Sequence, residues 1–65
     1  MSQVFDLKNS LNGESNITNF HKLLFDLILK ADNHNLYLLR QAFPNAVDMV
    51  EEYKKNGVII DLPYD

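Results

Sequence analysis

Pro44 lies between two stretches with helical character, and it places the strongest constraint on what this chain can fold into. Proline lacks a backbone N–H and its ring crowds the preceding turn, so a helix that arrives through Phe43 must end there. The same ring fixes φ at a value that suits the first turn of a new helix. The residue before proline is displaced toward extended geometry. The sequence therefore predicts two helices that meet in an αα corner at Pro44.

Three segments carry apolar residues at helical spacing, over about residues 17–31, 33–42 and 44–56. In the third segment the acidic residues come early, the lysines come late, and Gly57 follows as a typical left-handed end residue. We therefore predict an all-α domain of three helices over residues 17–57. Its core is expected to consist of Phe20, Leu24, Leu27, Ile28, Leu36, Leu39, Phe43, Val47, Val50 and Tyr53.

The two ends of the chain lack helical periodicity. Residues 1–16 are rich in turn-forming residues after a short apolar patch, and we expect a flexible segment there. Residues 58–65 are β-branched and then interrupted by Pro63, which favours an extended tail. Such a tail would pair with residues 4–7, pair with another copy of the chain, or lie across the helices.

Four large apolar residues remain outside this predicted core. Phe25 and Leu29 are four residues apart and form a second ridge on the first helix, and Tyr37 and Leu38 project from the second. A chain of 65 residues buries about 60% of its unfolded surface and gains much from a partner. We therefore predict a homodimer with an interface at Phe25, Leu29, Tyr37 and Leu38. A foreign partner on this surface, or the N-terminal segment folded back over it, is the alternative.

The charge is −3, and residues 44–65 hold all of the excess, with Lys54 and Lys55 against five acidic residues. An acidic chain without a basic stripe is a poor candidate for direct nucleic-acid binding. The start of the sequence does not resemble a secretory signal, and the longest apolar run, residues 27–29, is far too short for a membrane span. We expect a cytoplasmic protein with no contact to a membrane.

Patterns that carry chemistry are weak in this sequence. Without cysteine there are no disulfides or thiolate metal sites, and His21 and His34 lack paired-ligand spacing. Glu51 and Glu52 are adjacent on a helix and diverge by about 100°, which does not favour an acid–base pair. We expect no catalytic residues, no cofactor and no metal, and thus no enzyme.

The segment over residues 28–55 resembles a pattern found in small uncharacterised phage and prophage proteins. The likeness is carried by the following residues: Lys30-Ala31-Asp32, Asn35, Leu39-Arg40, Ala42-Phe43-Pro44, Val47, Val50 and Tyr53. The resemblance implies a helical fold and an origin in a mobile element, and it implies no activity.

Two functions follow as hypotheses. One is a small non-enzymatic interaction protein that self-associates and binds a protein partner, which could be a host protein. The alternative is an acidic decoy that occupies a nucleic-acid-binding site of a host protein, based on the negative charge after Pro44.

Overall fold

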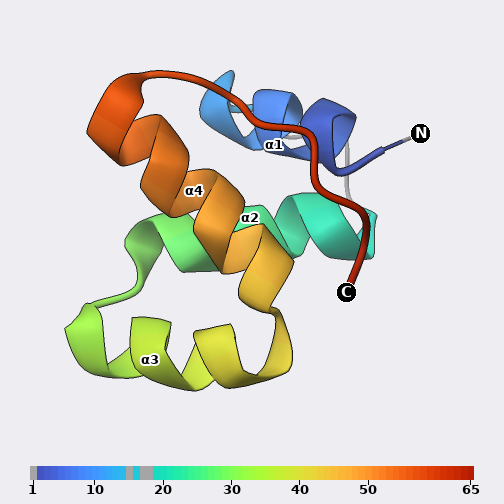
Figure 1. Cartoon of the computed structure of the whole chain (residues 1–65). Coiled ribbons are helices and arrows are strands. Elements are labelled where there is room, and N and C mark those ends of the chain that lie inside the picture. Colours follow the sequence, from blue (N-terminus) through green and yellow to red (C-terminus); the bar gives the residue numbers. More distant parts are fainter. Residues whose placement is uncertain (1, 15, 17–18) are drawn as a thin grey trace.

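The computed structural model describes residues 2–14, 16 and 19–65. This part of the chain contains four helices, α1 (Gln3–Leu11), α2 (Phe20–Lys30), α3 (Asn33–Ala42) and α4 (Pro44–Asn56), and no strand. α2 and α3 run in opposite directions, α4 crosses them, and α1 lies against α2 (Figure 1). The all-α class is confirmed, whereas the prediction of three helices is wrong.

α1 corrects the expectation of a flexible segment over residues 1–16. Ser2 caps this helix, because its hydroxyl group accepts a hydrogen bond from the Phe5 backbone N–H at 3.3 Å. The residues that α1 buries share one face and are Gln3, Asp6, Leu7 and Ser10. Three of these four are polar, so the helix lacks the apolar periodicity by which helices are recognised in a sequence.

α2 and α3 each begin at a capping side chain. The Asn19 side-chain oxygen accepts from the Lys22 backbone N–H at 2.9 Å, and the Asp32 carboxylate accepts from the Asn35 N–H at 2.8 Å. The first predicted helix was expected to begin at residue 17, but residues 17 and 18 lie outside the described part of the chain. Ala31 and Asp32 are extended and reverse the chain between the two helices.

The corner at Pro44 is confirmed. α3 ends at Ala42, Phe43 takes the non-helical angles φ −134° and ψ 65°, and Pro44 is the first residue of α4. The other end of α4 is closed by Gly57, which has a φ of 70° and donates its N–H to the Tyr53 carbonyl oxygen at 2.8 Å. A side chain at this positive φ would be strained, so glycine is favoured there.

The C-terminal tail, residues 58–65, lies across the helices, which is one of the three arrangements expected for it (Figure 1). Its apolar residues Ile59, Ile60 and Leu62 are half-buried against the core. Gln3 on α1 donates its amide N–H groups to the carbonyl oxygens of Leu62, at 3.1 Å, and Pro63. The tail is thus ordered by contacts with the helices.

The tail also caps α4. Phe43, at the N-cap position of α4, offers no side-chain acceptor for the free N–H groups of the first turn. Asp65 supplies one, because its carboxylate accepts from the backbone N–H groups of Asn45 at 2.8 Å and Ala46 at 3.2 Å. A negative charge at this position is also favoured by the helix dipole.

The core differs from the predicted one mainly on α2. The fully buried apolar residues are Leu7, Leu24, Phe25, Ile28, Ala46, Val47, Met49 and Val50. Leu24, Ile28, Val47 and Val50 were expected there. Phe20 and Leu27 were also expected there, but both are exposed, and Leu36, Leu39, Phe43 and Tyr53 are half-buried.

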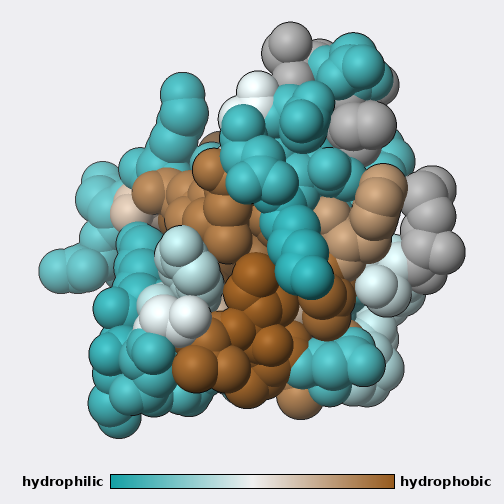
Figure 2. Space-filling view, turned by 90° about the horizontal axis from the view of Figure 1, so that it is seen from above, coloured by the Kyte–Doolittle hydropathy of each residue, from teal (hydrophilic) through white to brown (hydrophobic). Residues whose placement is uncertain are grey.

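Apolar side chains also reach the surface at the top of the molecule. In the view from above they form an area in the middle of that face, with hydrophilic side chains around it (Figure 2). Three large apolar or aromatic residues of α1 and the tail are exposed, namely Phe5 on α1 and Val58 and Tyr64 in the tail.

The capping role of Asp65 generates a stability prediction. We expect Asp65→Ala to lower the free energy of unfolding by about 1 kcal/mol, because α4 loses its N-terminal acceptor. Asp61→Ala removes an exposed carboxylate from the same tail and should change it by less than about 0.5 kcal/mol. Urea denaturation measures both variants. Equal effects would show that the Asp65 carboxylate does not cap α4.

Candidate functional site

The solvent-facing side of α2 is apolar. The exposed residues of this helix are Phe20, Leu23, Leu27 and Lys30, which lie on one face at intervals of three and four residues. Phe20 is 62% exposed and Leu27 is 55% exposed. Lys22, by contrast, is only 6% exposed. The usual arrangement of a surface helix, with its polar face outward, is therefore inverted over most of α2.

The inversion results from packing on the opposite face. α1 and α4 both pack against α2, and Leu24, Phe25 and Ile28 are buried in the core that these helices share. The buried Lys22 is accommodated there by Asp26, whose carboxylate oxygen lies 2.8 Å from the Lys22 Nζ. This hydrogen bond is the main cause that lowers the pKa of Asp26 below its ordinary value, against an opposing effect of desolvation.

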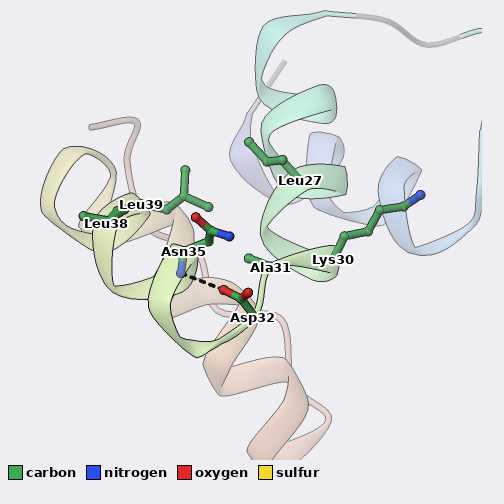
Figure 3. Close-up of a pocket in the computed structure, with 7 residues that line it drawn as sticks. All are labelled: Leu27, Lys30, Ala31, Asp32, Asn35, Leu38 and Leu39. Atoms are coloured by element: carbon green, nitrogen blue, oxygen red, sulfur yellow. Dashed lines mark hydrogen bonds between the residues drawn. The ribbon is translucent and has the colours of Figure 1, made fainter.

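A groove between α2 and α3 adjoins the exposed apolar face. It has a volume of about 390 Å³, and its lining comes from α2, α3 and the connection between them: Leu27, Lys30, Ala31, Asp32, Asn35, Leu38 and Leu39. Leu27 points from α2 toward α3, and Leu39 and Asn35 point from α3 toward α2 (Figure 3). Lys30 extends away from α3, and Leu38 lies on the outer side of the groove (Figure 3).

Two aromatic side chains meet at the other end of the two helices, where α2 begins and α3 ends. The Phe20 ring on α2 lies 5.8 Å from the Phe43 ring at the end of α3, measured between ring centroids. Such a pair is within the range of favourable aromatic contacts. We call the surface formed by Phe20, Leu23, Leu27, Leu38 and Leu39 the α2–α3 face.

The interface residues expected from the sequence are only partly on this surface. Phe25 is fully buried and Leu29 is half-buried against the core, so the structure places neither of them on the α2–α3 face. Leu38 does line the groove and is 49% exposed. Tyr37 is exposed as well, but it is not among the lining residues.

Sequence reasoning missed Phe20, Leu23 and Leu27 as surface residues. α2 carries apolar residues on two sides, and the broader stripe was assigned to the core. The side that contacts α1 is instead buried, since α1 covers the ridge of Phe25 and Leu29. No local signal in the sequence could have reversed the assignment, because the buried face of α1 is mostly polar and lacks apolar periodicity.

A second cluster of polar groups joins α1, α2 and the tail. The buried Asp6 carboxylate accepts hydrogen bonds from the Asn19 Nδ2, at 3.0 Å, and from the Tyr64 hydroxyl group, at 2.9 Å. Desolvation, with a further contribution from Asp6, raises the pKa of Tyr64 above its ordinary value. The His21 and Tyr64 rings lie 4.3 Å apart. These groups bind one another, so the cluster acts in holding the segments together.

The acidic surface of α4 is partly neutralised. Arg40 on α3 pairs with Asp48 and also with Glu51, whose carboxylate oxygen lies 3.0 Å from the guanidinium group. These hydrogen bonds raise the pKa of Arg40 further above its ordinary value. The pairing removes two of the free carboxylates on which an acidic decoy would depend.

Within residues 2–14, 16 and 19–65, no three metal-binding side chains gather in one place. The helices described for this chain are also too short and too polar to cross a membrane. Comparison with protein-family models, with curated proteins and with solved structures finds no match to this chain.

The ion pair between Lys22 and Asp26 on α2 leads to a prediction for the pH dependence of stability. The folded-state pKa of Asp26 is lowered, so this group stabilises the fold above about pH 4 and loses that contribution as the pH falls through the lowered pKa. We expect Asp26→Asn to reduce stability at neutral pH and to flatten this acid dependence. Thermal melting from pH 7 to pH 2 measures it, with Asp61→Asn as a control. An unchanged acid dependence in Asp26→Asn would contradict the assignment.

Proposed function

We propose that this protein is a small non-enzymatic interaction protein that binds another polypeptide through the α2–α3 face. The observation that carries the proposal is the exposure of large apolar side chains on the outer side of α2, above all Phe20, Leu23 and Leu27. Exposed apolar residues that form a contiguous patch beside a groove are typical of interaction surfaces, whereas single exposed ones are common.

The chemistry of the groove supports a polypeptide as its occupant. Its lining is mainly aliphatic, with Lys30, Asp32 and Asn35 at the end near the connection between α2 and α3. A helix that lies in an apolar groove uses side chains spaced by three and four residues, and two antiparallel helices offer a matching channel. The origin in a mobile element, suggested by the resemblance of residues 28–55, stays a prediction.

The proposal is tested by capture of a polypeptide in the organism that encodes the chain. Cells that produce tagged and untagged copies of the chain are lysed, and the tagged copy is recovered with whatever it retains, whether the untagged copy or another protein. We expect a retained polypeptide with wild type and its loss with Leu27→Asp, because the carboxylate would have to be desolvated in the groove. The Leu27→Asp variant should fold, since Leu27 is exposed.

Tyr37→Asp is the matched control, because it adds the same charge to an exposed position of α3 that does not line the groove. It should retain the same polypeptide as wild type. Retention should persist at about 1 M salt, where the Debye length is about 3 Å, because the contact is apolar. If Leu27→Asp retains the same polypeptide as wild type and retention is lost at high salt, the proposal is contradicted and the acidic decoy is favoured.

A further inference from the structure

The exposed residues of α2 have a symmetric spacing. Phe20, Leu23, Leu27 and Lys30 are separated by three, four and three residues, so the pattern reads the same from both ends of the helix. A two-fold axis through the middle of this pattern would place Leu23 of one helix against Leu27 of the other. The same axis would place Phe20 of each helix against Lys30 of the other.

We infer that the occupant of the α2–α3 face is a second copy of this chain, with the two α2 helices antiparallel about a two-fold axis. The inference rests on the proposed function and specifies the partner. A two-fold interface uses the same patch on both subunits, which requires a surface that is complementary to itself. The symmetric spacing on α2 meets this requirement.

The apolar area is sufficient for such a dimer. The exposed parts of Phe20, Leu23, Leu27 and Leu38 amount to roughly 400 Å² per subunit, given the usual size of such side chains. The pair would bury roughly 800 Å² before the half-buried Leu39 and the rim residues are counted. That brings the total to the range of about 1,000 Å² at which a specific interface becomes plausible in size.

The distribution of charge is compatible with self-association. The chain carries a charge of −3, and all of the excess lies in residues 44–65, outside this face. Lys30 is the charged residue among the exposed positions of α2. Opposite Phe20 of the other copy, its ammonium group would approach the face of an aromatic ring, which is a favourable contact.

The arrangement of the helices also suits a dimer. α2 and α3 form an antiparallel hairpin whose groove side is open, while α4 packs against both helices (Figure 1). Two such hairpins, placed face to face, form a four-helix bundle with short connections. Leu38 and Leu39 of each copy would then complete the core around the paired α2 helices.

The test uses opposite charges at one position. In Phe20→Glu, the introduced carboxylate would face Lys30 of the other copy, and in Phe20→Lys the introduced ammonium would face the same lysine. Both variants lose the same ring, so the comparison isolates the charge. We expect a dissociation constant at least tenfold higher for Phe20→Lys than for Phe20→Glu, because the contact occurs twice in each dimer. Sedimentation equilibrium at low salt measures both, against the 7.5 kDa monomer.

Net charge alone predicts the opposite order. Phe20→Glu changes the charge from −3 to −4, and Phe20→Lys changes it to −2, so general repulsion would weaken the Phe20→Glu dimer more. The double variant Phe20→Lys with Lys30→Glu should restore the dimer that Phe20→Lys weakens. Together these variants identify the antiparallel contact between positions 20 and 30.

Three results would overturn the inference. They are equal dissociation constants for Phe20→Glu and Phe20→Lys, a double variant that dimerises no better than Phe20→Lys, and a wild type that is monomeric at about 0.1 mM. If the wild type is a monomer and captures a foreign protein that Leu27→Asp does not capture, the inference is wrong, but the proposed function stands with that protein as the partner. If the wild type is a monomer and Leu27→Asp captures the same proteins as wild type, both the inference and the proposed function are wrong.

Discussion

Hydrogen bonds to the buried carboxylate of Asp6 hold the N-terminal helix, the start of α2 and the tail together. This carboxylate accepts hydrogen bonds from Asn19, which caps α2, and from Tyr64 in the tail, so one side chain of α1 joins three segments. A buried carboxylate without such donors would cost several kcal/mol, and with them it fixes the relative positions of its partners. α1 is thereby held against α2 although its buried face is mostly polar.

The position of α1 determines which side of α2 faces the solvent. Because α1 covers the side with Phe25, the other apolar side is left outside, with Phe20, Leu23 and Leu27. The buried Lys22 is part of the same arrangement, since Asp26 pairs with it and the Ser10 hydroxyl group of α1 donates to its carbonyl oxygen at 2.7 Å. The fold of the N-terminal part thus creates the candidate interaction surface on α2.

The local signals in the sequence were sufficient for the all-α class, the corner at Pro44 and the end of α4 at Gly57. The corner and the end of α4 each depend on one residue and its neighbours in the chain. Pro44 lacks a backbone N–H, and Gly57 adopts a left-handed conformation. The position of α1 and the cap from Asp65 were not predictable in this way. Both depend on hydrogen bonds between residues far apart, such as Asp65 with Asn45 and Gln3 with Leu62. The side of α2 that is buried depends on α1, so the apolar residues of α2 that face the core and those that face the solvent were not distinguishable from the sequence.

Hydrogen exchange of individual backbone amides shows most directly whether α1 is a stable helix packed on α2. We expect the amides of residues 6–11 to exchange slowly, with protection comparable to that of the amides in α2, because the two helices pack against each other and Asp6, Leu7 and Phe25 are buried. Exchange over residues 6–11 at the rate of an unstructured peptide, with α2 still protected, would show that α1 is not a stable helix packed on α2.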